Sequence, residues 1–408
     1  MPPNFAHQTM WTGDNLPILR GMNSDSVDLI YADPPFNSKA NYAAPVGSQA
    51  AGAAFKDTWG LSDVDAEWVN LIEAKHPRVH RVLLAAMTDG DKAYLVYMAA
   101  RLLELRRVLK ASGSIYLHCD PTMSHYLKLL MDAVFGRANF RNEVIWQRHR
   151  GFKRRTAKQF TQKNDSVLFY AKSVEHVHFQ TQFVPHKPEY VRRFRKDADG
   201  RLYRDDVNPT RGGRRRIYLD ETDGDIVDNV WIDIPPVNPN AKERVGYPTQ
   251  KPLALLKRMI AASAPPNGMV LDPFCGCATA CIAAEQLGRQ WIGIDISPKA
   301  AELVTLRMRD ELGLFYQGTV RRDIPRRTDL GPLPTPRSHR NALYGEQGGD
   351  CAGCGEHFRL ANLEVDHIVA RAAGGTDHVE NLQLLCGACN RVKGDRGMAY
   401  LRVKLGLA

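Results

Sequence analysis

Short apolar runs alternate with segments of helical periodicity along much of the chain. Such runs occupy residues 26–32, 113–119, 268–272 and 291–296. Each predicts a buried strand, because a short apolar run bounded by turn residues fits a strand that is covered on both faces. In residues 93–110 the apolar side chains instead recur every three or four positions, which predicts a helix. Strands that alternate with helices predict an α/β fold with a parallel sheet.

This periodicity fails between residues 147 and 245, where basic and aromatic residues intermingle. Lysine and arginine cluster at 153–155, 192–196 and 214–216. The alternation of helices and strands resumes at residue 252. We therefore expect residues 147–245 to be a module inserted between two halves of one α/β domain.

The positive charge of the chain is concentrated around the first part of this module. The whole sequence carries a net charge of +10. Residues 141–216 hold 20 Lys and Arg against 8 Asp and Glu, so this segment alone carries +12 and the remainder about −2. A local excess of this size favours a polyanionic partner over an evenly solvated surface.

The sequence has none of the features of a membrane or secreted protein. No stretch approaches the roughly 18 apolar residues that a spanning helix needs, and the N-terminus does not resemble a signal peptide. Four of the eight cysteines lie in or beside apolar segments, which predicts small core residues: Cys119, Cys275, Cys277 and Cys281. We expect a cytoplasmic protein with no membrane partner.

The other four cysteines form two C-x-x-C pairs near the C-terminus. These pairs, separated by 31 residues, consist of Cys351, Cys354, Cys386 and Cys389. Four thiolates at this spacing suit tetrahedral zinc, which would replace a core that roughly sixty residues cannot easily build. Residues 319–342, rich in Arg and Pro, are typical of a linker to a small domain at 343–408.

An acidic turn, Asp33-Pro34-Pro35-Phe36, follows the first of the apolar runs. Two prolines stiffen the turn and remove backbone donors, which leaves carbonyl oxygens beside a carboxylate. Such oxygens can accept both N–H bonds of an exocyclic amine, and the Phe36 ring can stack on the base that carries it. An acidic turn that merely ends a strand is the alternative.

A second turn, Asp272-Pro273-Phe274-Cys275-Gly276, lies between a predicted strand and a predicted helix. Ligands of parallel sheets bind at this end of the strands. The next predicted strand ends at Asp295, about twenty residues on, where a carboxylate can accept hydrogen bonds from ribose hydroxyls. Together the two features favour a nucleotide-like cofactor over a purely structural turn.

Four motifs in this chain order resemble the β group of circularly permuted DNA amino-methyltransferases. They are Gly13-Asp14, Asp33-Pro34-Pro35-Phe36, Tyr247-Pro248-Thr249-Gln250-Lys251-Pro252 and Asp272-Pro273-Phe274-Cys275-Gly276. The resemblance spans about residues 8–315. It implies a Rossmann-like, S-adenosylmethionine-dependent methyltransferase whose catalytic half comes first, whose target-recognition insert follows and whose cofactor half comes last.

The resemblance also implies roles for individual residues. The turn Asp33, Pro34, Pro35 and Phe36 would hold the target amine, and Asp272, Phe274 and Gly276 would line the cofactor pocket. Asp295 would bind the ribose, Asp14 would lie near the adenine and Lys251 would cap the pocket. Ala278 departs from the family pattern, which has a second glycine there. If this residue needs a positive φ, alanine would cost roughly 1–2 kcal/mol.

The substrate implied by the resemblance is double-stranded DNA. A base inside a duplex cannot reach such a pocket, so the target nucleotide has to be flipped out at a cost of about a few kcal/mol. The small-residue loop 37–58 is a candidate lid over the flipped base, and deletion of residues 43–54 would then reduce methylation more than cofactor binding. Trp231, in the insert, is expected to be a core residue rather than a base wedge.

The residues around the second C-x-x-C pair resemble the HNH nuclease fold, a zinc-bound ββα unit. The resemblance spans about residues 346–396 and rests on Asp366-His367, Asn381 and Asn390 between and after the cysteine pairs. It implies that His367 is the general base and that Asn381 orients its ring. Asp366 and Asn390 would hold a magnesium or manganese ion.

We therefore expect a bacterial or phage enzyme with two DNA-directed activities. The parts are a catalytic half at 1–146, the insert at 147–245, a cofactor half at 246–318, the linker and the nuclease domain. The D-P-P-F turn is more typical of adenine N6 than of cytosine N4 methylation, which remains the alternative. A C-terminal domain that only binds DNA is a further alternative, and a homodimer is left open.

Overall fold

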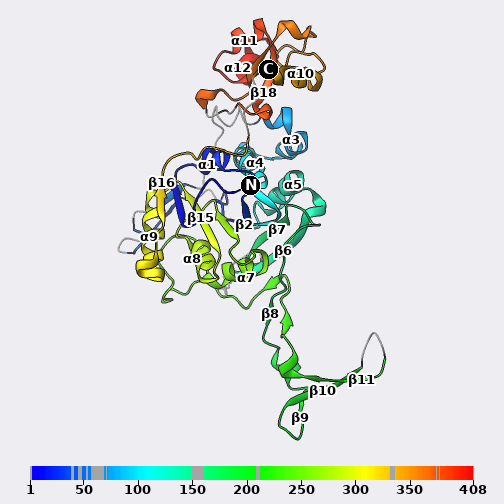
Figure 1. The fold of residues 1–408 in the computed structure, drawn as a ribbon, viewed down its shortest axis with the longest axis vertical. Coiled ribbons are helices and arrows are strands. Elements are labelled where there is room, and N and C mark those ends of the chain that lie inside the picture. The colour runs from blue at the N-terminus through cyan, green and yellow to red at the C-terminus, as the bar shows by residue number, and fades with distance from the viewer. Residues whose placement is uncertain are drawn as a thin grey trace.

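The computed structural model describes most of the chain, and Figure 1 shows its fold. The described residues are 2–37, 41–44, 48–51, 54–56, 69, 71–148, 158, 160–207, 212–330, 336–373, 375 and 377–407. Of the candidate lid, residues 38–40, 45–47, 52–53 and 57–58 lie outside these ranges. Its described parts include β3 (Asn41–Ala43) and β4 (Ala54–Lys56), which pair antiparallel, so this loop contains a short ribbon that its composition did not predict.

A nine-stranded sheet forms the centre of the body, in the order β13-β6-β7-β5-β2-β14-β15-β1-β16. Neighbours from β5 to β16 are parallel, as predicted, whereas β7 runs antiparallel to both β5 and β6. The strands are β1 (Thr9–Thr12), β2 (Val27–Ala32), β5 (Leu109–Cys119), β6 (Phe140–Gln147), β7 (Asn164–Ala171), β13 (Val230–Trp231), β14 (Met269–Asp272), β15 (Gln290–Asp295) and β16 (Thr319–Arg321).

Helices cover both faces of the sheet, and the sheet divides the core in two. Alternate residues of β2 show the division, since Ile30 packs in one core and Tyr31 in the other. The first core contains α1 (Asn15–Gly21), α3 (Pro77–Leu83), α4 (Asp89–Val108) and α5 (Ser124–Phe135). The second contains α7 (Leu253–Ser263), α8 (Thr279–Gln286) and α9 (Pro298–Leu312). Two short 3-10 helices, η1 (Arg137–Asn139) and η3 (Gly313–Phe315), follow α5 and α9.

The segment expected as one insert is divided between the sheet and a projecting arm. Strand β7, within residues 147–245, is buried along nearly its whole length and lies between β5 and β6. Its apolar run Val167–Ala171 explains this position, and the basic residues around it hid the run. Strand β13 also joins the sheet, where Trp231 is 6% exposed, so its prediction as a core residue is confirmed.

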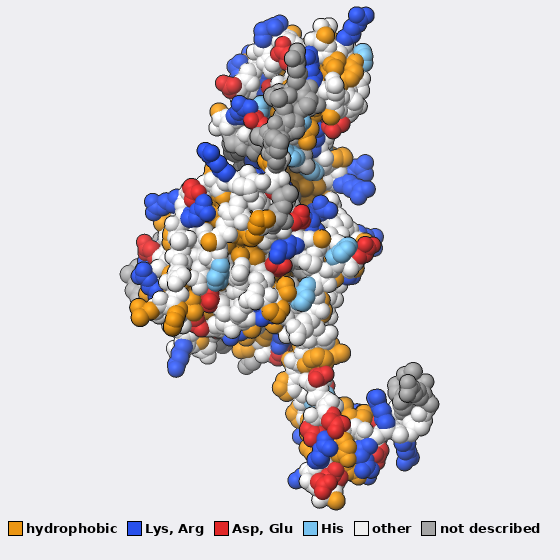
Figure 2. Space-filling view, in the orientation of Figure 1, with side chains coloured by type: hydrophobic (Ala, Val, Ile, Leu, Met, Phe, Trp, Pro, Cys, Tyr) orange, Lys and Arg blue, Asp and Glu red, His pale blue; other side chains and the backbone are white. Residues whose placement is uncertain are grey.

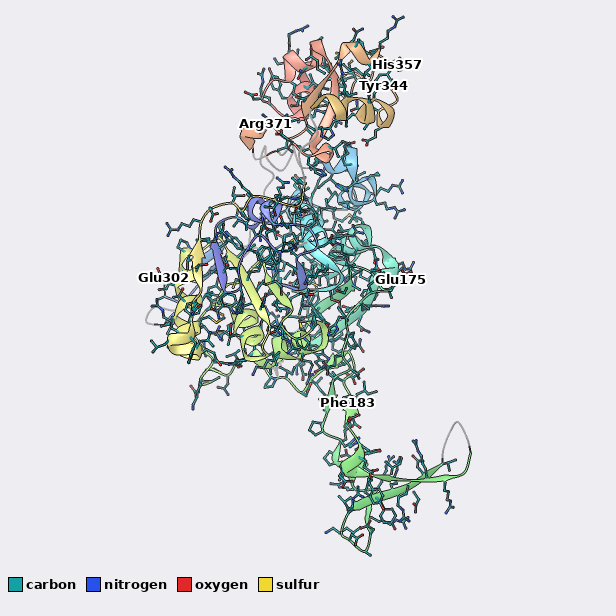
Figure 3. The ribbon with its side chains drawn as sticks, in the orientation of Figure 1. Glu175, Phe183, Glu302, Tyr344, His357 and Arg371 are labelled. Carbon is teal, nitrogen blue, oxygen red and sulfur yellow. The ribbon has the colours of Figure 1, made fainter. Side chains whose placement is uncertain are left out.

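The arm leaves the body near Phe183, as Figures 1 and 3 show. Its stem is β8 (Phe183–Val184) paired with β12 (Asp225–Ile226), and its end is the sheet β11-β10-β9. Basic side chains lie on this end in Figure 2. The other elements of the arm are α6 (Pro188–Val191), β9 (Arg195–Lys196), β10 (Leu202–Val207), β11 (Arg214–Tyr218) and η2 (Leu219–Glu221).

The C-terminal unit has its own small core around Leu343, Leu384 and Leu401. It contains α10 (Pro336–Glu346), η4 (Leu360–Asn362), β17 (Leu363–His367), η5 (Arg371–Ala373), η6 (Val379–Asn381), β18 (Leu382–Cys386), α11 (Gly387–Lys393) and α12 (Met398–Lys404). The expected linker is therefore shorter than residues 319–342, because β16 belongs to the sheet and α10 to this unit.

The cysteines assigned to the body, Cys119, Cys275, Cys277 and Cys281, are buried and free, as predicted. Among the described residues, no helix has both the length and the apolar character needed to cross a membrane.

Candidate functional site

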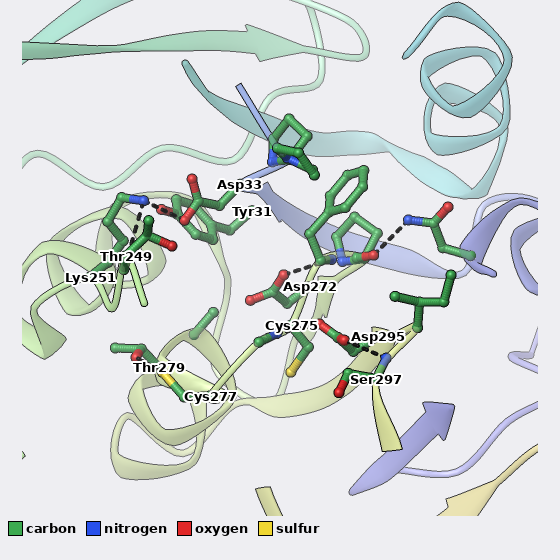
Figure 4. Close-up of a pocket in the computed structure, with 18 of the residues that line it drawn as sticks. Tyr31, Asp33, Thr249, Lys251, Asp272, Cys275, Cys277, Thr279, Asp295 and Ser297 are labelled. Carbon is green, nitrogen blue, oxygen red and sulfur yellow. Dashed lines mark hydrogen bonds and ion pairs between the residues drawn. The ribbon is translucent and has the colours of Figure 1, made fainter. Parts of the chain in front are cut away.

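A cavity of about 230 Å³ opens at the carboxyl ends of β2, β14 and β15. The three strands are parallel neighbours, so the turns that follow them meet at one edge of the sheet. Figure 4 shows this pocket. It brings together all ten residues that the sequence assigned to target and cofactor binding: Asp14, Asp33, Pro34, Pro35, Phe36, Lys251, Asp272, Phe274, Gly276 and Asp295.

Asp33 and Lys251 form an ion pair in the cavity. Lys251 Nζ donates a 2.5 Å hydrogen bond to Asp33 Oδ2, and Nζ also lies 5.2 Å from the centre of the Phe36 ring. Asp33 Oδ1 is buried and has no hydrogen-bond partner among the described residues. A buried carboxylate oxygen without a donor costs free energy, so this oxygen is suited to accept a hydrogen bond from a ligand.

Asp272 and Asp295 hold the second turn in shape. Asp272 Oδ1 accepts from Phe274 N at 3.1 Å, and Asp295 Oδ2 accepts from Gly276 N at 2.7 Å. The other oxygen of Asp295 accepts from Ser297 N at 2.8 Å. Burial raises the pKa of both carboxyls, that of Asp272 well above its usual value. A cationic ligand would stabilise the ionised form of both carboxyls, which burial disfavours.

The backbone of the turn is left-handed at two positions. Gly276 has a φ of 51°, and a Cβ there would lie 3.0 Å from the Tyr247 ring. Ala278 has a φ of 63° and a ψ of 29° and precedes α8. The positive φ anticipated for this residue is therefore present, although its methyl group is buried in the second core.

Asp14 lies beside a cation that sequence reasoning missed. Its Oδ1 accepts from Leu16 N at 3.0 Å, which caps α1, and from Arg101 Nη2 at 2.7 Å. Arg101 is buried, and its Nε donates to Asn15 Oδ1 at 2.6 Å. Nothing in the helical pattern of α4 distinguishes this arginine from its neighbours Arg106 and Arg107.

The charges around the cavity favour a positively charged ligand. Four carboxyl groups line it, against the two cations Arg101 and Lys251. Both cations are already paired, with Asp14 and Asp33. Asp272 and Asp295 form no ion pair among the described residues, and because burial raises the pKa of both, a cationic ligand such as the sulfonium of S-adenosylmethionine would favour their ionised forms.

In the C-terminal unit, the four predicted zinc ligands come together. The sulfur atoms of Cys351, Cys354, Cys386 and Cys389 all lie within 4.8 Å of one another. Backbone N–H groups of Gly353 and Cys386 donate to Cys351 Sγ at 3.4 and 3.2 Å. Burial raises the pKa of Cys351, but hydrogen bonds donated by backbone N–H groups such as these lower it by more. The pKa of Cys351 therefore lies below its usual value. This arrangement fits a tetrahedral metal.

His367 is paired with a residue that sequence reasoning did not single out. Its Nε2 lies 2.7 Å from Asp377 Oδ1, and Arg371 Nη2 lies 2.6 Å from the same oxygen. The hydrogen bond with His367 is the largest of the interactions that lower the pKa of Asp377. A carboxylate on one ring nitrogen fixes the tautomer and directs the other nitrogen elsewhere. In the sequence, Asp377 comes two residues after Gly375, where no periodicity marks it.

Asp366 and Asn390 lie on facing surfaces of β17 and α11, each with its own partner. Asp366 Oδ2 accepts from Gln383 Nε2 at 2.8 Å and lies 3.1 Å from Lys393 Nζ. Asn390 Nδ2 donates to Glu364 Oε2 at 2.5 Å. A hard divalent ion would find oxygen donors here, but it would have to displace the buried ammonium of Lys393 from Asp366.

Asn381 acts on the backbone that follows His367. Its Oδ1 accepts from Val369 N at 2.9 Å, and its Nδ2 donates to Val369 O at 3.0 Å. Val369 is two residues beyond His367 and packs in the first core of the body. Asn381 therefore fixes the chain that carries the histidine.

Several known proteins are similar to this chain. It is 28% identical over 269 residues to the type II methyltransferase M.EcaI of Enterobacter cloacae, which covers 53% of this chain and 58% of the relative. It is 26% identical over 319 residues to the DNA adenine methyltransferase YhdJ of Escherichia coli K12, covering 75% and 85%. A DNA modification methylase of Thermus thermophilus, solved in complex with S-adenosyl-L-methionine, gives a TM-score of 0.45 at 18% identity, covering 78% of this chain and 98% of that one.

Some of the relatives are much longer than the region that they share with this chain. The shared region covers 58% of M.EcaI and only 51% of the StyLTI Mod subunit, a type III restriction-modification protein of Salmonella typhimurium. The chain thus spans little more than half the length of these curated relatives.

Two families match separate parts of the chain. Residues 27–306, well over half of it, match the family described as DNA methylase, and this range includes Asp33, Asp272 and Asp295. Residues 351–396 match the family described as HNH endonuclease, and this range includes His367 and all four clustered cysteines. The chain therefore belongs to the DNA methylase family and carries a C-terminal HNH endonuclease domain.

Proposed function

We propose that this protein transfers a methyl group from S-adenosylmethionine to the N6 amine of an adenine flipped out of double-stranded DNA. The observation that carries the proposal is the buried Oδ1 of Asp33, which lacks a hydrogen-bond partner among the described residues, on a side chain that lines the same cavity as Asp272 and Asp295. One carboxylate oxygen is held by Lys251, and the other is left for the target amine.

The residues of the cavity mainly supply orientation. In the transfer the amine nitrogen would bond the methyl carbon as the bond from that carbon to sulfur breaks, the thioether would leave, and the methylated amine would release a proton. Bound S-adenosylmethionine supplies a sulfonium methyl that is already electrophilic. Asp33 accepts a hydrogen bond from the target amine and aims its lone pair, while Phe36 stacks on the base. Asp295 accepts from ribose hydroxyls, and Asp272 and Phe274 line the pocket. The two halves of the domain thus bring the two substrates together.

The basic arm is proposed to contact the DNA around the target base. Arg214, Arg215 and Arg216 on β11 are exposed, and Arg195 lies across the small sheet on β9. Arginine and lysine on such a surface provide phosphate contacts, and some of them would read base edges. The division into catalytic half, recognition module and cofactor half stays a prediction, as do a homodimer and a cytoplasmic location.

The test is to identify the methylated nucleoside. Genomic DNA from a host without DNA methylation is incubated with the protein and S-adenosylmethionine, digested to nucleosides and analysed by mass spectrometry. We expect N6-methyladenine with the wild type and none with Asp33→Ala. N4-methylcytosine would replace the adenine proposal with its alternative, and no methyl mark would overturn methyl transfer to DNA.

We propose a second activity, metal-dependent DNA cleavage, for the C-terminal domain. The observation that favours it is the 2.7 Å contact of His367 Nε2 with Asp377, which suits a general base with a fixed tautomer. Zinc would be held by the four cysteines, and a magnesium or manganese ion by Asp366 and Asn390. Glu364 lies next to Asn390 and offers a further oxygen.

Plasmid cleavage separates this proposal from a domain that only binds DNA. Supercoiled plasmid is incubated with the full chain and Mg²⁺ or Mn²⁺, and nicked and linear products are measured. We expect cleavage by the wild type and none by His367→Ala, with unchanged methylation in both. If neither protein cleaves, the domain is left with a binding role.

A further inference from the structure

His118 lies fully buried behind the Asp33-Pro34-Pro35-Phe36 turn and has a hydrogen-bond partner on each ring nitrogen. Nδ1 lies 3.0 Å from the hydroxyl of Tyr31, and Nε2 lies 3.2 Å from Asp165 Oδ2. His118 is the last residue but one of β5, as Tyr31 is of β2. The pair therefore lies at the carboxyl edge of the sheet, where the cavity opens.

This buried group touches the proposed active site at two points. Tyr31 itself reaches the cavity, since it is one of the lining residues. The rings of His118 and Phe36 lie nearly parallel, with an interplanar angle of 22° and 5.9 Å between their centres. Trp146 meets the His118 ring edge-on at 5.9 Å and closes another side.

The hydrogen-bonded group of His118, Tyr31 and Asp165 lies in largely apolar surroundings. Asp165 is 1% exposed, and its other oxygen lies 3.2 Å from Arg148 Nε. The residues that follow Asp165 and Ser166 on β7 are apolar. A buried ion pair often stabilises a fold no more than well-packed apolar residues of similar volume would, so a stability role alone does not account for Asp165 here. Two hydrogen bonds do, however, fix both the tautomer and the plane of an imidazole ring.

We propose that His118 is a positioning residue for methyl transfer. Tyr31 and Asp165 hold its ring, and the ring supports Phe36 in the plane on which the flipped adenine stacks. The inference rests on the proposed methyl transfer and deepens it, because alignment of the amine with the methyl group depends on that plane. A misplacement of about 1 Å at a reacting centre costs on the order of a hundredfold in rate.

Three variants test this role, and only one of them, Tyr31→Phe, alters a side chain that lines the cavity. His118→Gln keeps hydrogen-bonding atoms but loses the ring, Tyr31→Phe loses only the hydroxyl and Asp165→Asn loses the charge. Tyr116→Phe is the matched control, because Tyr116 is buried on β5 and its hydroxyl bonds Ser263 Oγ at 2.8 Å, outside the His118 group. The measurements are single-turnover methylation of unmethylated genomic DNA, calorimetric binding of S-adenosylmethionine and thermal unfolding.

We expect His118→Gln to lower the methylation rate by about tenfold or more and Tyr31→Phe by less. The affinity for S-adenosylmethionine should stay within about twofold of the wild type in both, and Tyr116→Phe should methylate normally. The proposal is overturned if His118→Gln methylates as fast as Tyr116→Phe, or if its rate and cofactor affinity fall in parallel. A wild type that binds S-adenosylmethionine but transfers no methyl group overturns the proposed function itself.

Discussion

Lys251 Nζ donates a 2.5 Å hydrogen bond to Asp33 Oδ2, although 218 residues separate the two in sequence. Both side chains are largely buried, with 8% and 17% of their surface exposed. The pair joins the turn after β2 to the segment before α7, and so ties the first half of the domain to the second across the cavity. It also leaves only one oxygen of Asp33 for a ligand.

Replacing Lys251 by Met should lower both stability and methylation. The substitution leaves the Asp33 carboxylate buried without its cation, and removing one partner of a buried pair costs about 3–5 kcal/mol, less here because Asp33 is partly exposed. The double variant Lys251→Met with Asp33→Asn should regain much of that stability and still transfer no methyl group. Denaturant unfolding and single-turnover methylation measure the two effects. Equal stability of the two variants would contradict the pairing argument.

Replacing Ala278 by Gly should leave the fold slightly more stable. Alanine in the left-handed region costs roughly 1–2 kcal/mol, while the buried methyl group contributes about 0.8 kcal/mol, so a gain of up to about 1 kcal/mol is expected. Ala283→Gly, in the interior of α8, is the matched control. It should lose stability, because glycine is unfavourable inside a helix and a buried methyl group is also lost. Denaturant unfolding distinguishes them, and equal losses in both variants would refute the strain at Ala278.

The sequence pattern predicted that the acidic turns meet at one edge of the sheet, whereas the strands inside the expected insert were not predicted. Asp33, Asp272 and Asp295 each end an apolar run, and parallel strands bring such ends together, so their meeting follows from the pattern. Arg101 was missed because a buried arginine in a helix has no local signature. Strand β7 was missed because the basic residues around it masked a short apolar run, and only pairing with β5 and β6 reveals it.

The affinity for S-adenosylmethionine should rise with pH. Burial holds the pKa of Asp272 well above its usual value, with Asp33 and Asp295 raising it further and Lys251 opposing them. A cation bound nearby favours the ionised carboxylate, so binding releases a proton and strengthens as the pH approaches the pKa of the free protein. Calorimetry in two buffers of different ionisation enthalpy measures the released proton. Asp272→Asn should abolish the release, and an unchanged release would assign it to another group.

Removal of zinc should unfold the C-terminal domain alone. The small core around Leu384 packs against the cysteine cluster, so without the metal the four thiols would be a buried polar group with little to hold them together. We expect one zinc per chain by elemental analysis, loss of it in Cys386→Ser, and retention in His357→Ala, whose exposed imidazole lies beside Asp350 in the same domain. Figure 3 labels His357.

Because the cavity of the body lies in a separate core, Cys386→Ser should still bind S-adenosylmethionine with wild-type affinity while losing plasmid cleavage. Loss of cofactor binding together with zinc would mean that the two domains depend on each other for folding, through contacts such as the 2.9 Å pair of Lys75 and Glu346.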